Sequence, residues 1–202
     1  MKRHIRRIAL VGLVVIGIFA WELLTDSRTL HDQLLRLHVV GASDSKADQD
    51  VKLLVRDAVL QSLEEGLQDL TDVDAAVDYV ARMLPNVEEA AERVLAAAGF
   101  DDQVSVSLTE EAFPTREYDT FSLPAGVYKA LRVVIGEGEG KNWWCVVFPQ
   151  LCMGGDFVQT ASVAGMSDEL TDTLEGEYEV RFWLLEKLGQ LKNRFFDPSE
   201  SD

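Results

Sequence analysis

The chain has 202 residues, 47% of them hydrophobic, which is enough to bury one sizeable core at roughly 100 to 200 residues per domain. Acidic residues outnumber basic ones by 35 to 19, and the formal net charge is −16. A surface of this sign disfavours nucleic acid and anionic lipid headgroups as ligands, because both are polyanions.

The first 24 residues predict a signal peptide or a signal anchor. A cationic start, MKRHIRR, precedes the apolar run of residues 8–20, which Trp21 follows. The run is shorter than the roughly 20 residues that span a bilayer comfortably, and Ile18 and Ala20 match a cleavage site poorly. We favour an anchor and leave cleavage open. The basic start stays in the cytoplasm, so the rest of the chain is expected on the other side of the membrane.

Three parts follow the leader in the predicted organisation. Residues 25–33 form a polar tether, residues 34–195 form a single exported domain, and residues 196–202 form a disordered acidic tail. The sequence contains no internal repeat that would divide the domain further.

Alternating apolar and polar residues predict the strands. Residues 34–41 alternate leucine and valine with Arg36 and His38, which indicates one buried face and places His38 toward solvent or a covered polar pocket. Residues 103–108 alternate in the same way. Residues 127–149 contain two β-rich runs joined by GEGEGKN, and this composition predicts a hairpin.

Apolar residues spaced by three and four predict three consecutive helices between the first two strands. They are expected to start at Ser45, Thr71 and Asn86, each of which has an acidic residue three positions later. Pro85 is expected to stop the second helix and Gly99 the third.

A final helix is predicted at residues 177–193, with Trp183 on the stripe that packs against the sheet. The element order is therefore strand, three helices, strand, hairpin and helix. This order predicts an α+β fold with a mixed or antiparallel sheet of about four strands covered by about four helices, preceded by the hydrophobic signal or anchor segment.

Cys145 and Cys152 are the two cysteines of the chain, and three states are open for them. They can form a disulfide if Phe148 and Pro149 turn the chain back, they can be buried free thiols, or one can be a catalytic thiol. A thiol nucleophile needs a base, and His38 is the histidine available in the folded domain. An exported thiol hydrolase that uses Cys145 with His38, acting on peptide or cell wall, is the alternative function.

Other chemistry is not indicated. No cluster of residues has the spacing of a zinc site, and residues 43–50 lack the central glycine and terminal glutamate of a calcium-binding loop. No helix start follows the glycine-rich segment, so a phosphate site is not expected there. We therefore expect no catalytic residues, no metal and no cofactor.

Two features suggest a surface for a partner. Asp48, Lys52 and Arg56 recur every fourth residue of a predicted helix, so they form an exposed strip that is either a solvated face or a recognition surface. Trp143 and Trp144 are adjacent on a predicted strand, so their rings point to opposite faces. Either both rings are covered by helices or one of them is exposed as an interface anchor.

Two long strings resemble the stage II sporulation protein R family. LRLHVVGASDSKADQDVKLLVRDAVL is similar to that family's R-x-H-V-[IV]-A-N-S-D-S-x-x-D-Q-x-x-K-x-x-V-R-D segment, and LPAGVYKALRVVIGEGEGKNWWCVVFPQLC is similar to its glycine-rich segment leading into N-W-W-C. Gly41 and Ala42 depart from the family's Ala and Asn, and the change removes an amide side chain. The strings cover about a third of the predicted domain, at the positions expected for the family.

The resemblance implies a sporulation signal, not an enzyme. Such a protein is made in the forespore and exported to the space between the forespore and mother-cell membranes, where it is secreted or membrane-anchored. Its partner there is the membrane-embedded aspartic peptidase that processes pro-sigma-E. The residues predicted to form the partner surface are His38, Ser43, Asp44, Asp48, Gln49, Lys52, Arg56, Asp57, Asn142, Trp143 and Trp144.

Overall fold

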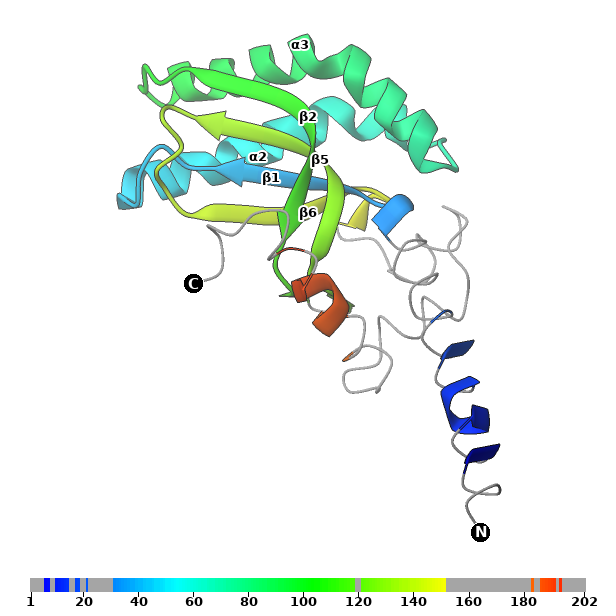
Figure 1. Cartoon of the computed structure of the whole chain (residues 1–202). Helices are drawn as coiled ribbons and strands as arrows, with labels where there is room; N and C mark the ends of the chain where they lie inside the picture. Colours follow the sequence, from blue (N-terminus) through cyan, green and yellow to red (C-terminus); the bar gives the residue numbers. More distant parts are fainter. Residues whose placement is uncertain are drawn as a thin grey trace.

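The computed structural model describes residues 6–7, 10–14, 17–18, 21, 31–118, 121–151, 183, 186–191 and 193. Its labelled elements, in chain order, are β1 (Leu35–Val40), α2 (Lys46–Leu67), α3 (Val73–Ala97), β2 (Val104–Phe113), β3 (Arg116–Glu117), β4 (Ser122–Leu123), β5 (Gly126–Ile135) and β6 (Asn142–Phe148). Figure 1 shows the two long helices α2 and α3 beside a twisted sheet.

The main sheet has the strand order β2-β5-β1-β6. Strand β1 is parallel to β5 and antiparallel to β6, and β2 is antiparallel to β5. This arrangement confirms the predicted α+β class and a mixed sheet of four strands. Shorter helical stretches accompany α2 and α3 at residues 10–14 and 186–191.

The predicted hairpin at residues 127–149 is wrong, because β1 lies between β5 and β6. The glycine-rich loop therefore crosses the end of β1 instead of making a tight turn. Gly136 and Gly138 adopt φ values of +58° and +69°, which residues with a side chain rarely adopt. The loop is also bonded to the residues that follow β1, since the Gly140 amide donates to the Gly41 carbonyl at 2.9 Å.

All six residues of β1 are buried, so the expectation of a single buried face is also wrong. A strand with a neighbour on each side has no edge in water, and here both of its faces are covered as well. Leu37 and Val39 face the helices, whereas Arg36 and His38 face a second layer of aromatic residues. The sequence pattern showed the alternation of β1 but not the layer of aromatic residues that covers its second face.

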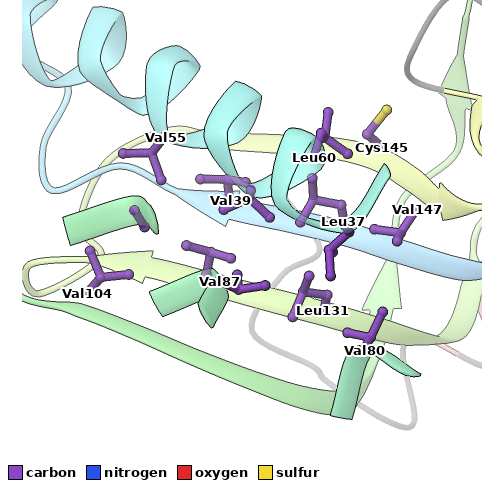
Figure 2. Packing of buried hydrophobic residues seen from close by; sticks show 14 of the residues in the cluster. Leu37, Val39, Val55, Leu60, Val80, Val87, Val104, Leu131, Cys145 and Val147 are labelled. Carbon is purple, nitrogen blue, oxygen red and sulfur yellow. The ribbon is translucent and has the colours of Figure 1, made fainter. Parts of the chain in front are cut away.

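The main core fills the space between the sheet and the two helices (Figure 2). Val55 and Leu60 come from α2, and Val80 and Val87 come from α3; they meet Leu37 of β1 and its neighbours. Burying such side chains stabilises the fold by about 1.5–3 kcal/mol each. This core fixes the position of α2 relative to β1 and β6.

Helix α2 starts as predicted. The Ser45 side chain caps it by accepting a hydrogen bond from the Asp48 amide at 3.1 Å. The stop at Gly99 is also confirmed, because Gly99 has a φ of +83° and the Phe100 amide donates to the Leu95 carbonyl at 2.9 Å.

The second and third predicted helices are one helix, α3, which begins after the cap residue Asp72 and continues through Pro85 to Ala97. A proline inside a helix costs about 3 kcal/mol because it removes one backbone hydrogen bond. The buried residues on the two sides of Pro85 lie on one continuous stripe: Ala76, Val80, Val87, Ala90, Ala91 and Leu95. Packing this whole stripe against the sheet outweighs the cost of the proline.

The packing expected of the final helix differs from what is found. Trp183 and Leu191 are helical but 55% and 54% exposed. Contact with the rest of the domain comes instead through Gly189, where an added Cβ would lie 1.4 Å from the Ala125 carbonyl oxygen. Asn193 adds a hydrogen bond from its amide to the Phe113 carbonyl at 2.7 Å. The helix therefore contacts the domain through the small residue Gly189, and not through the Trp183 side chain that was expected to pack there.

Within the described residues, no helix combines the length and apolar character needed to cross a membrane. The predicted roles of residues 1–24 and 25–33, and the tail at 196–202, stay predictions.

Candidate functional site

Ser43 organises the loop between β1 and α2. Its hydroxyl donates to the Asp48 carboxylate and accepts from the Ser45 amide at 3.1 Å. The Gln49 side-chain amide donates to the Ser43 carbonyl at 2.8 Å. Three of the residues predicted to bind a partner therefore hold this loop in one conformation.

The same loop binds the glycine-rich loop that precedes β6. The Asp44 carboxylate accepts from the Lys141 amide at 2.8 Å. Gly140 lies so close that an added Cβ would be 2.4 Å from the Ser43 carbonyl oxygen, which leaves no space for a side chain. The two strings that carried the family resemblance are thus one structural unit, although about a hundred residues separate them in the chain.

Lys52 lies beneath this unit and is only 3% exposed. Its ammonium group donates to the Gln49 side-chain oxygen at 2.6 Å and to the Lys141 carbonyl at 2.7 Å. Burial lowers the pKa of Lys52, and the nearby Asp44 carboxylate partly opposes that shift. The predicted exposed strip is therefore wrong at Lys52, which is a structural residue between two loops.

Arg56 and Trp143 remain at the surface where α2 meets β6. The Arg56 guanidinium lies over the Trp143 ring, 4.5 Å from its centroid, and pairs with Asp57 at 2.7 Å. Trp143 is 36% exposed, and the Arg56 side chain is 21% exposed. Of the two adjacent tryptophans, Trp143 is therefore the accessible one. We call Arg56, Asp57 and Trp143 the tryptophan patch.

His38 lies on the opposite face of the sheet and is 2% exposed. Its two ring nitrogens are each 2.9 Å from an oxygen atom, Nδ1 from Glu111 and Nε2 from Asn142. Its ring stacks on Trp144, with centroids 3.7 Å apart. Arg132 donates to the same Glu111 oxygen at 2.8 Å. Of the residues predicted to form one partner surface, His38 and Trp144 are thus buried on the far face.

Arg36 is the main residue that the sequence reasoning missed. It is fully buried, and its guanidinium lies 4.3 Å from the Phe113 ring centroid. It donates to the Cys145 carbonyl at 3.0 Å and to the Tyr118 hydroxyl at 2.9 Å. The Tyr128 hydroxyl, which donates to the Pro124 carbonyl, has its pKa raised by burial in the same layer. Arg36 shares a strand face with His38, and this alternation was the available signal.

The proposed pairing of Cys145 with His38 is contradicted by the geometry. Cys145 faces the helix-covered core, where it lies opposite Leu37, whereas His38 lies opposite Trp144 in the other layer. Adjacent residues of a strand point to opposite faces, so the sheet itself separates the two side chains. Cys145 is also disulfide-bonded, so it offers no free thiol. Cys152 lies outside the described residues, and its pairing with Cys145 stays a prediction.

The described residues include no group of three or more histidine, cysteine, aspartate or glutamate side chains gathered to hold a metal ion. The polar residues of the loop between β1 and α2 are instead bonded to one another or to backbone groups. Such an arrangement supports a surface presented by a rigid scaffold.

The comparisons with known proteins identify the family. A family model described as stage II sporulation protein R matches residues 31–157, so the chain belongs to that family. Stage II sporulation protein R of Bacillus subtilis (strain 168) is 31% identical over 183 residues, which cover 79% of this chain and 82% of that protein. No solved structure matches.

Proposed function

We propose that this protein is an exported signalling protein of sporulation that activates the membrane-bound aspartic peptidase processing pro-sigma-E in the mother cell. It is made in the forespore and exported to the space between the two membranes, where residues 1–24 anchor it or direct its secretion. Membership of the stage II sporulation protein R family supports a role in sporulation. The signalling step, the partner and the location are the proposal.

The observation that carries the proposal is the tryptophan patch. Trp143 is 36% exposed and its ring is covered by the Arg56 guanidinium, and the loop that precedes β6 is held to α2 by the Lys52 hydrogen bond to the Lys141 carbonyl. Tryptophan and arginine are the residues that most often dominate binding energy at protein interfaces. A rigid base reduces the entropy lost when such a surface docks.

Activation requires that the patch binds the active form of the peptidase more tightly than the inactive form. A ligand with equal affinity for two states shifts no equilibrium between them. The contacts of Trp143 and Arg56 are therefore formed fully only with the active peptidase. No bond is broken by this chain in the mechanism that we propose.

The proposal is tested in sporulating cells by following pro-sigma-E processing. Trp143→Ala and Arg56→Ala are expected to lower processing while protein levels stay unchanged. Leu54→Ala is the matched control, because Leu54 is an exposed apolar residue of the same helix, 51% accessible, that does not belong to the patch. Equal processing in all three strains would reject the patch as the activating surface.

A further inference from the structure

We propose that the outer edge of β2 is a site for strand addition, at which another protein contributes an extended segment that alternates apolar with polar residues and carries lysine or arginine near one end. This inference does not depend on the proposed function, and it concerns the edge of the sheet farthest from the tryptophan patch. Figure 1 shows β2 as the outermost strand on that side.

The β2 edge is long and regular. Its ten residues pair with β5 in an unbroken register from Val104 to Phe113. Strands in globular proteins are usually about 5–6 residues long, and exposed edges are normally interrupted by a bulge, a proline or a lysine. The sequence of β2, VSVSLTEEAF, contains no proline or lysine and its pairing has no bulge; its two charged residues, Glu110 and Glu111, lie in its second half.

The outward backbone groups can be assigned from one bond. The Gly136 amide donates to the Gln103 carbonyl at 2.8 Å, so the backbone of Gln103 faces β5. Backbone direction alternates along an antiparallel pair, so Val106 and Leu108 direct their N–H and C=O groups away from the sheet. Neither residue has a hydrogen-bond partner on that outer side in the described part of the chain.

The opposite edge of the sheet differs in this respect. On β6, the Trp144 carbonyl, which points away from β1, accepts a hydrogen bond from the Tyr118 hydroxyl. Within the described residues, the chain itself bonds the outward Trp144 carbonyl of β6, whereas the outward groups of Val106 and Leu108 in β2 have no such partner. Unpaired groups of this kind form the template for an added strand.

Charge identifies the occupant. A second copy of the chain would bring another formal charge of −16 to the edge, which disfavours self-pairing. Glu110 is exposed on β2, and Asp74 lies close by through its ion pair with Lys129, the β5 residue opposite Glu110. A basic residue on the incoming strand would be attracted to this end.

Side chains define the rest of the incoming segment. Val106 and Leu108 are partly buried and pack against the main core, so apolar residues of the added strand would extend that core. Ser105, Ser107 and Thr109 are exposed on the other face and would accept polar neighbours. The segment that fits therefore alternates apolar with polar residues and includes lysine or arginine.

The test uses the full chain and a synthetic ten-residue peptide of alternating valine and threonine with two lysines near one end. The control peptide has the same sequence with alternate backbone nitrogens methylated, so that it cannot form a ladder. We expect the unmethylated peptide to bind about tenfold more tightly or better, since each lost hydrogen bond costs about 1 kcal/mol or more. Its binding should also slow amide exchange at Val106 and Leu108.

Two variants complete the test. Val106→Pro removes one outward N–H and should weaken peptide binding about tenfold, whereas Thr109→Lys keeps every backbone group and should weaken binding by repelling the lysines. Thr109→Lys gives the answer if the proline variant fails to fold. Equal binding of both peptides, unchanged amide exchange at the edge, or a dimer that Val106→Pro dissociates would each overturn the proposal.

Discussion

The His38 ring stacks on the Trp144 indole, with the two planes 16° apart. These residues lie opposite each other on β1 and β6, so each family string provides one of the two rings. The stack is buried on the far face of the sheet, whereas the neighbouring Trp143 is accessible on the helix side. One pair of adjacent tryptophans therefore supplies both a core residue and a surface residue.

The two tryptophans should lose different amounts of stability on truncation. Trp144→Ala removes a buried ring and should lower the free energy of unfolding by about 3–5 kcal/mol. Trp143→Ala removes a partly exposed ring and its contact with Arg56. The lost cation–π contact should lower the free energy of unfolding by only about 1 kcal/mol, in addition to the cost of the lost contact area. Urea unfolding followed by circular dichroism measures both. A larger loss for Trp143→Ala would show that the assignment of inside and outside is reversed.

Lys52→Met should destabilise the domain, although lysine is normally a surface residue. The methionine keeps the apolar stem but leaves the Lys141 carbonyl and the Gln49 side chain without their donor, which costs about 1–3 kcal/mol. Lys46→Met on the exposed first turn of α2 is the matched control and should change little. Equal unfolding midpoints for the two variants would mean that Lys52 is not structural.

The stability contributed by Lys52 should also depend on pH. Burial lowers the pKa of Lys52 in the folded chain below 10.5, its ordinary value. At pH values between the folded and the unfolded pKa, the unfolded chain therefore holds more of the Lys52 proton than the folded chain does. Stability of the parent relative to Lys52→Met should therefore rise with pH across that window and be constant below it. Unfolding free energies measured in a series from neutral to alkaline pH check the sign, and a decrease would contradict it.

Pro85→Ala should stabilise α3. The substitution restores a backbone donor inside a helix that is already continuous, and the gain should be at most about 3 kcal/mol. Thermal unfolding measures it. If α3 were two helices that meet at Pro85, the alanine variant would show no gain or would lose stability.

Cys145→Ala should lower stability by about 2–5 kcal/mol, because it removes a disulfide, yet it should leave signalling intact wherever the fold survives. If Cys152 is the partner, Cys152→Ala should cost nearly as much, and the double variant should cost little more than either single change. Additive losses would reject that pairing. Loss of signalling from a folded Cys145→Ala protein would restore a role for the thiol.

Local signals in the sequence were sufficient for the start of α2 and the end of α3, but not for the predicted starts at Thr71 and Asn86. The caps at Ser45 and the stop at Gly99 depend on residues within one turn of each other, so they can be predicted without knowledge of the fold. Pro85 failed as a signal for a helix end because the deciding factor was a stripe of buried residues that continues on both sides of it.

Strand order required contacts between distant segments. The insertion of β1 between β5 and β6 depends on side chains that meet across about a hundred residues, and the composition of the glycine-rich loop is equally compatible with a hairpin. The same limit applies to the site. Spacing placed Lys52 beside Arg56 on one helix, but only the docked loop shows that Lys52 is buried and Arg56 is accessible.

The most direct test of the central claim is reconstitution of the peptidase in a membrane with its pro-sigma-E precursor, with and without this protein. We expect precursor cleavage to depend on the added chain, to persist with Cys145→Ala if it folds, and to fall with Trp143→Ala. Cleavage at the same rate in the absence of the chain, or with the folded Trp143→Ala variant, would contradict the account.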